Sequence, residues 1–126
     1  MIEITTYLGC ALLVALILFQ IALILGAPFG NYAWGGQHRV LPTKLRIGSA
    51  SSIVIYLLFM AFLVSKSGVW NIITHEPTLT IGMWAMTGYL FFGVLLNAIS
   101  RSKQERMVMV PVALVLAICF LVGALV

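Results

Sequence analysis

The sequence predicts an all-α integral membrane protein, a four-helix bundle made of two transmembrane hairpins. Of its 126 residues, 63% are hydrophobic and 8% are charged, whereas water-soluble domains carry about 25% charged residues. Four stretches contain no Asp, Glu, Lys, Arg or His, and each approaches the roughly 20 residues that a helix needs to cross a bilayer. We expect one transmembrane domain over residues 1–126, with helices at about 4–26, 43–65, 77–100 and 103–126.

The first expected helix starts close to the beginning of the chain. No positively charged region precedes it, and its apolar run is longer than the core of a signal peptide, so we expect it to remain as a span. Gly26 and Pro28 should end it, because glycine tolerates the left-handed cap and proline cannot continue a helix.

The other three helices have their own start signals. Pro42 precedes the second, and Pro77 suits the first turn of the third, where its missing N–H is not needed. Ser102 and Glu105 fit a capping box at the start of the fourth. The turn before Ser102 is short, so the third and fourth helices should be antiparallel neighbours. Pro111 predicts a kink that neighbouring helices can accommodate.

The basic residues predict an orientation in the cell membrane. The connection between the first two helices holds Arg39, Lys44 and Arg46, and the last turn holds Arg101, Lys103 and Arg106. The opposite side has Lys66. Cytoplasmic loops of membrane proteins carry the excess of Lys and Arg. We therefore expect loops 28–46 and 101–106 to be cytoplasmic and both termini to lie outside.

Polar residues within the spans gather at one depth, near the expected cytoplasmic side. This polar layer comprises Gln20, Ser49, Ser52, Asn97 and Arg101. The favoured interpretation is hydrogen bonding between helices, worth about 0.6 kcal/mol for each bond on average. The alternative is a polar pocket that opens towards the cytoplasm.

The connection over residues 26–42 combines glycine, proline and aromatic residues. Its aromatic side chains favour an apolar surface, so it does not resemble a flexible linker. Glycine N–H groups can surround an anion, and basic side chains follow them, which makes the segment a candidate site for an anionic headgroup, a phosphate-bearing ligand or a partner. The candidate residues are Gly30, Trp34, Gly35, Gly36, His38, Arg39 and Arg46. Anchoring at the lipid surface is the favoured alternative.

The sequence predicts no catalytic residue, metal site, cofactor or nucleic-acid partner. His38 and His75 are expected on opposite sides of the membrane, so they cannot share a metal ion. Glu105 is assigned to helix capping, and no nucleophile has a base beside it. Cys10 and Cys119 are interpreted as buried apolar residues, which could pair if the first and fourth helices touch.

Two stretches resemble a group of small, uncharacterised four-helix bacterial membrane proteins. One combines Gly26 to Gly30, Gly35 to His38 and Leu41 to Arg46. The other combines Asn97 to Ser100, Ser102, Glu105 to Arg106 and Pro111 to Leu114. The resemblance implies a fold and a membrane location, and it implies no activity. The chain differs from small multidrug exporters, which have a glutamate in their first helix.

Three functional hypotheses follow, and the first is favoured. The chain is a non-catalytic membrane protein that binds or regulates a membrane partner through its Gly-rich basic loop. The second hypothesis is a small homo-oligomeric channel or transporter, lined by the polar layer. The third, an enzyme acting on a lipid or quinone, is less favoured than a role without catalysis. The expected partners are membrane lipids, together with another protein or further copies of the chain.

Overall fold

The computed structural model describes residues 2–126, and the regular structure of this part is helical. Four long helices account for most of the chain: α1 (Ile2–Ile24), α2 (Thr43–Ser67), α3 (Glu76–Ala98) and α4 (Lys103–Leu125). Two short 3-10 helices, η1 (Gly30–Tyr32) and η2 (Trp34–Gly36), lie in the connection between α1 and α2. The all-α fold predicted from the sequence is confirmed.

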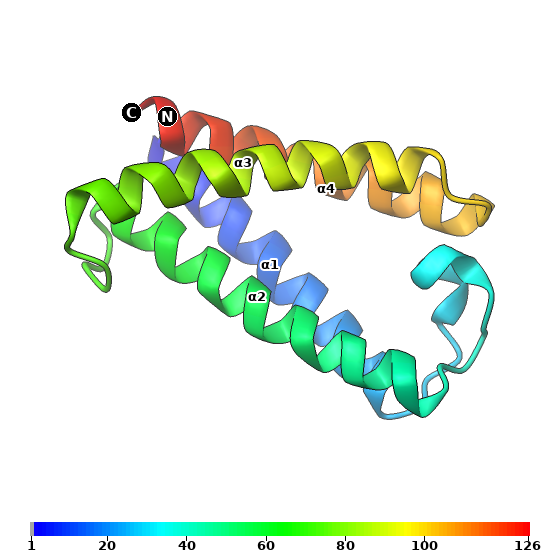
Figure 1. Cartoon of the computed structure of the whole chain (residues 1–126). Helices are drawn as coiled ribbons and strands as arrows, with labels where there is room; N and C mark the ends of the chain where they lie inside the picture. The colour runs from blue at the N-terminus through cyan, green and yellow to red at the C-terminus, as the bar shows by residue number, and fades with distance from the viewer. Residues whose placement is uncertain (1) are drawn as a thin grey trace.

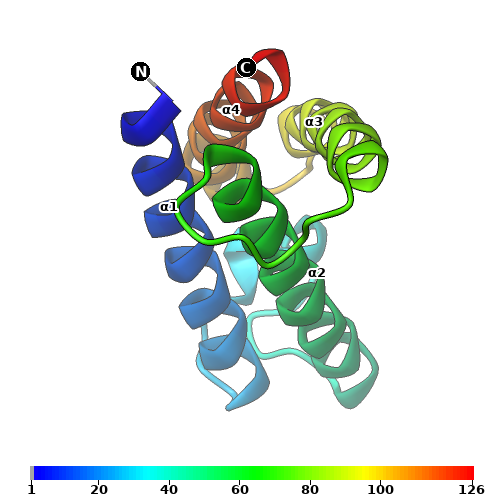
Figure 2. The same ribbon diagram turned by 90° about the vertical axis from the view of Figure 1, so that its left-hand side faces the viewer.

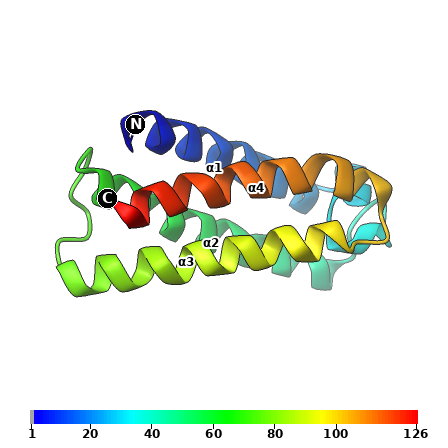
Figure 3. The ribbon, with the colours of Figure 1, turned by 90° about the horizontal axis from the view of Figure 1, so that it is seen from above.

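The helices form two antiparallel hairpins, α1 with α2 and α3 with α4, and α4 also packs beside α1. Both termini and the α2–α3 loop lie at one end, which we call the terminal end (Figure 1; Figure 2). The α1–α2 connection and the α3–α4 turn lie at the other, which we call the basic end (Figure 3). The hairpins meet near the terminal end and diverge towards the basic end (Figure 1).

Local chemistry at the helix ends agrees with the start and stop signals. Beyond α1, Gly26 adopts φ +93°, its N–H donates to the Leu23 carbonyl, and the Ala27 N–H donates to the Ala22 carbonyl. This pair of bonds is a Schellman motif, which satisfies carbonyl groups that the helix end leaves open. At the start of α4, Ser102 Oγ accepts a hydrogen bond from the Glu105 N–H.

The main core lies where the hairpins meet. It contains side chains from all four helices, among them the fully buried Leu13, Leu63, Met83 and Phe120. The Phe120 ring packs against Phe59 with 5.5 Å between ring centroids. The divergence of the hairpins therefore starts from a closely packed junction between α2 and α4.

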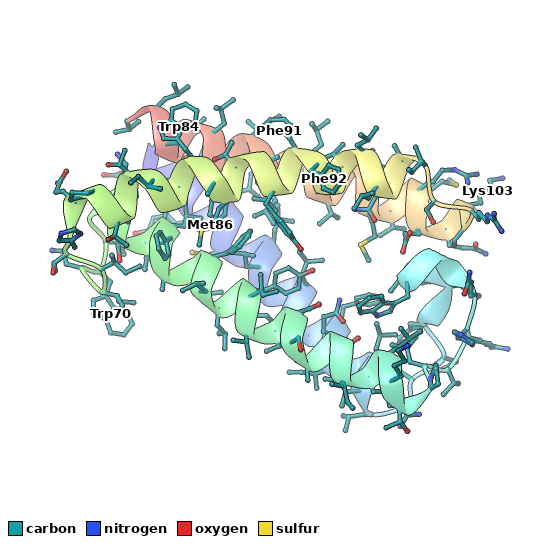
Figure 4. All side chains as sticks on the ribbon, viewed as in Figure 1. Trp70, Trp84, Met86, Phe91, Phe92 and Lys103 are labelled. Carbon is teal, nitrogen blue, oxygen red and sulfur yellow. The ribbon has the colours of Figure 1, made fainter. Side chains whose placement is uncertain are left out.

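Large apolar side chains cover much of the outside of the bundle. Trp84 and Phe91 point away from it on α3, whereas Met86 points inwards (Figure 4). The four long helices are each long and apolar enough to cross a membrane, and lipid is the solvent that suits such a surface. The chain is therefore a multi-pass membrane protein.

Two predicted details concern α1 and α4. The two helices are in contact, which was the condition for pairing of the two cysteines, and Cys10 and Cys119 are free thiols, the latter buried. Pro111 lies inside α4, which continues on both sides of it.

Replacing Phe120 with Ala should destabilise the bundle, because the ring is fully buried at the junction of the hairpins. The loss should be smaller than the ~3–5 kcal/mol typical of water-soluble cores, since lipid tails solvate exposed apolar surface. Thermal unfolding in detergent, followed by circular dichroism, measures the effect. Ile118→Ala is the control, because Ile118 is exposed on the same helix. Equal melting temperatures for the two variants would contradict the assignment of Phe120 to the core.

Candidate functional site

The connection between α1 and α2, residues 25–42, folds back between the diverging hairpins (Figure 1; Figure 3). We call it the wedge. Its buried Ala33 and Leu41 pack with Leu23 at the end of α1, which forms a second, smaller apolar cluster. The wedge thus has a core of its own and is a fixed part of the bundle.

Hydrogen bonds from both hairpins hold the wedge in place. The Gly30 N–H donates to the Arg39 carbonyl at 2.8 Å, which closes the wedge on itself. Arg46 Nε, on α2, donates to the Leu41 carbonyl at 2.8 Å. From the other hairpin, Ser102 Oγ donates to the Asn31 carbonyl. These bonds satisfy backbone carbonyl groups of a segment that contains no α-helix.

Close backbone approaches explain two of the wedge glycines. A Cβ atom at Gly30 would overlap the carbonyl oxygens of His38 and Arg39, and one at Gly36 would overlap the Cβ of Ser102. Gly30 therefore allows the wedge to cross itself, and Gly36 allows it to touch the α3–α4 turn. Gly35 faces open space instead.

Trp34 occupies an unusual backbone conformation. Its φ of 53° lies in the left-handed region, which is rare for bulky residues and costs on the order of 1–3 kcal/mol. Its indole Nε1 donates to the buried Ser49 Oγ at 3.3 Å, and its ring lies over Gly48. These contacts with α2 hold the strained residue in place, and they aim the ring at the space between the hairpins.

A cavity of about 250 Å³ lies between the hairpins, beside the wedge. All four long helices and the wedge contribute to its wall, which is mainly apolar. The lining residues from α1, α2 and the wedge are Leu16, Phe19, Gln20, Tyr56, Tyr32, Ala33 and Trp34. Those from α3 and α4 are Tyr89, Leu90, Phe92, Gly93, Leu96, Asn97, Glu105, Met109, Val112, Ala113 and Leu116.

Gln20 contributes a buried polar side chain to this wall. Its side chain is 7% exposed, and its Oε1 atom is buried without a hydrogen-bond partner in the described part of the chain. The Tyr56 hydroxyl hydrogen-bonds with the amide group of the same side chain, which leaves Oε1 as the atom without a partner. A buried polar atom that lacks a partner costs about 1–3 kcal/mol. The cavity thus contains an open acceptor that a bound molecule could satisfy.

Glu105 also lines the cavity, and it corrects the capping box predicted from the sequence. Ser102 Oγ does accept from the Glu105 N–H at 3.2 Å, as predicted. The reciprocal bond to the Ser102 N–H is replaced, because that N–H donates to Ser100 Oγ at 3.1 Å. The Glu105 side chain, 7% exposed, is instead part of the cavity wall.

Several residues of the cavity wall are also exposed on the outside of the bundle. Trp34 in the wedge is 42% exposed, and Tyr89, Phe92 and Leu96 on α3 are about half exposed. Phe92 lies on the outer surface in Figure 4. A molecule could therefore enter from the lipid-facing side of the bundle.

The residues of the polar layer predicted from the sequence do not form one group in the structure. Gln20 and Asn97 line the cavity, and Asn97 Nδ2 donates to the Gly93 carbonyl at 2.9 Å. Ser49 holds Trp34, and Ser52 Oγ donates to the Gly48 carbonyl within its own helix.

The predicted basic residues lie outside the cavity. His38 and Arg39 are exposed, and Arg46 holds the wedge. Arg101 borders a separate polar hollow between the wedge and the α3–α4 turn, together with Gly35, Gly36 and Lys103. Lys103 projects at this end of the molecule (Figure 4). The hypothesis of an anion site here stays a prediction.

Sequence reasoning missed Glu105, Tyr56 and Tyr89 as parts of one site. A signal existed for Glu105: with Met109, Val112 and Leu116 it follows the three- and four-residue spacing of one helix face. Leu116 is buried, so this face of α4 turns inwards. No pattern in the sequence places Tyr56 opposite Tyr89, because the divergence of the hairpins decides it.

Comparisons with protein-family models, with curated proteins and with solved structures find no match for this chain. The resemblance noted above therefore stays a prediction. Within residues 2–126, no group of three or more His, Cys, Asp or Glu side chains could hold a metal ion.

Gly30→Ala should disrupt the wedge, because the added methyl group would overlap two backbone carbonyl oxygens. Gly35→Ala is the matched control, since its methyl group meets open space and carries only the left-handed backbone cost of about 1–2 kcal/mol. Hydrogen exchange at the Gly36 amide, which donates to the Ala33 carbonyl, reports the state of the wedge. Faster exchange is expected for Gly30→Ala than for Gly35→Ala, and the reverse order would refute the crossing.

Proposed function

We propose that this chain is a non-catalytic membrane protein that binds a small amphipathic molecule in the cavity between its hairpins. In this proposal the partner expected from the sequence is a ligand, and the wedge is one wall of its site. The unpartnered Gln20 Oε1 atom in an otherwise apolar, aromatic wall carries the proposal. Ligand pockets combine such walls with a few convergent polar groups.

The size of the cavity supports a ligand that is only partly enclosed. Its 250 Å³ lie just below the roughly 300–1,000 Å³ of typical ligand pockets. A headgroup and the first part of an alkyl chain would fill it. The remainder of the chain would leave past Tyr89 and Phe92 into the surrounding lipid.

Binding is favoured over conduction through one copy of the chain by the packing of the terminal end. Towards that end the cavity borders Leu90 and Leu116, which belong to the main core. Beyond them, Leu63, Met83 and Phe120 are fully buried in the same core. A molecule that enters from the side of α3 therefore meets packed side chains in that direction.

The basic end supports a cytoplasmic assignment for the wedge in the cell membrane. The α1–α2 connection and the α3–α4 turn lie at this one end (Figure 3). Together with the first turns of α2 and α4, they carry six of the seven Lys and Arg residues. The positive-inside rule then puts both termini outside. Basic side chains around the wedge would face anionic lipid headgroups of the inner leaflet.

Filling the cavity should abolish ligand binding. Gly93→Phe projects a ring into it, since Gly93 lines the wall and its Cβ would meet no atom within 4 Å. Gly88→Phe is the matched control on the same helix, with equally open space and a position outside the cavity. The probes are dodecanol and dodecylamine carrying the same diazirine, and the measurement is saturable photolabelling of the protein in phosphatidylcholine nanodiscs.

We expect labelled peptides from residues 89–97 and around Tyr56 in the wild-type protein and in Gly88→Phe, and loss of that labelling in Gly93→Phe. Circular dichroism and thermal unfolding establish that both variants are folded. If neither probe labels the wild-type cavity saturably, the proposed function is wrong. Equal labelling of the two variants would show that the probes bind outside the cavity.

Orientation is tested by single cysteines in a chain whose Cys10 and Cys119 are replaced by alanine. Gln37→Cys lies in the wedge, and Asn71→Cys lies in the α2–α3 loop, both at exposed positions. A membrane-impermeant maleimide added to intact cells should label the cysteine at position 71 and spare the one at 37 until the cells are lysed. The opposite pattern would invert the proposed topology.

A further inference from the structure

We infer that the ligand carries a protonated amine, so that the cavity binds an ammonium-headed amphiphile in preference to a neutral or anionic one. This inference rests on the proposed function, and it specifies the chemical class of the ligand at the same site. Three features of the wall support it: the sign of its charge, the direction of its open hydrogen bond and its aromatic content.

The charge of the wall has one sign. Glu105 lines the cavity and is 7% exposed, whereas the lining residues drawn from positions 2–126 include no Lys, Arg or His. Because this carboxylate lines a cavity whose wall is mainly apolar, its attraction for an opposite charge is less screened than it would be in bulk water. An anionic headgroup would meet repulsion at this point, and an ammonium group would meet attraction.

The open hydrogen bond requires a donor from the ligand. Gln20 Oε1 is an acceptor, and it has no partner in the described chain. An ammonium or hydroxyl group can donate to it, whereas an ether, an ester or an oxidised quinone offers only acceptors. A quaternary ammonium group has a charge but no N–H, so it would satisfy Glu105 and leave Gln20 open.

The aromatic content of the wall adds a third attraction for a cation. Six rings line the cavity, those of Phe19, Tyr32, Trp34, Tyr56, Tyr89 and Phe92. Cations are attracted to the faces of such rings, most strongly to tryptophan, and the attraction grows when the site is desolvated. A neutral alkyl chain gains little from the same rings in a membrane, because lipid tails provide a similar apolar surrounding.

The route of entry agrees with this class of ligand. The basic side chains lie at the basic end, whereas the exposed Tyr89 and Phe92 of the cavity wall lie on the flank of α3. An amphiphile in the bilayer would approach along that flank, past exposed apolar side chains. Arg101 and Lys103 line the separate hollow and do not touch the cavity.

The experiment compares matched probes on the intact protein in phosphatidylcholine nanodiscs, with empty nanodiscs to correct for partitioning. Dodecylamine, dodecanol, dodecyl methyl ether and dodecyltrimethylammonium carry the same diazirine. At pH 7 the primary amine is protonated, since alkylamine pKa values lie near 10.4. The apparent Kd of dodecylamine should be about tenfold or more below that of dodecanol, the range expected for a charge-assisted hydrogen bond.

Two variants assign the preference to named side chains. Glu105→Gln keeps the shape of the side chain and removes its charge, so it should bring the amine and alcohol affinities close together. Gln20→Leu should weaken the binding of dodecylamine and of dodecanol, which both donate a hydrogen bond. It should leave the affinity for dodecyl methyl ether unchanged. On the wild-type protein alone, the amine should bind more tightly than the trimethylammonium probe, which makes the inference testable even if a variant fails to fold.

The outcomes separate this inference from the proposed function. Saturable labelling of the cavity with equal affinities for amine, alcohol and ether would overturn the ammonium class and leave the cavity as a binding site. A preference that persists in Glu105→Gln would also overturn it, because the carboxylate would then not be its source. Absence of saturable labelling by all the probes would overturn the proposed function as well.

Discussion

The space between the hairpins depends on one constraint, the need to satisfy the backbone polar groups of a segment that contains no α-helix. The glycines and prolines of residues 25–42 prevent a continuous α-helix, yet the aromatic side chains of this segment favour an apolar surrounding. The segment meets both demands by folding between the hairpins, where Gly30 bonds to Arg39 and Ser102 bonds to Asn31. Its bulk occupies the space between the diverging hairpins, and the cavity lies beside it.

The lipid around the bundle limits which interactions could distinguish one ligand from another in this cavity. In water, burying each methylene group of an alkyl tail would contribute about 0.8 kcal/mol. An amphiphile that arrives from the bilayer has its tail in hydrocarbon already, so apolar contacts with the cavity add little. Discrimination must come from groups that lipid tails lack, and in this wall those are Gln20, Glu105, Asn97, the tyrosines and Trp34.

The sequence was sufficient for the features that depend on local chemistry and composition. The four spans, the caps at Gly26 and Ser102 and the contact between α3 and α4 follow from apolar length, turn residues and a short connection. It was insufficient for the site, which depends on the angle between two hairpins. Glu105 shows the difference, since its spacing from Ser102 fits a reciprocal cap, and tertiary packing turned its side chain into the cavity instead.

Trp34 connects the two halves of the sequence-based hypothesis, the Gly-rich segment and the polar layer. Its ring lines the cavity, its indole bonds to Ser49 and its backbone lies in a strained conformation within the wedge. Tyr32 and Ala33 of the wedge line the same cavity. One wall of the cavity is therefore built by the segment that also carries the exposed His38 and Arg39. In the proposed function, a ligand in the cavity would contact this segment directly, in addition to the four long helices.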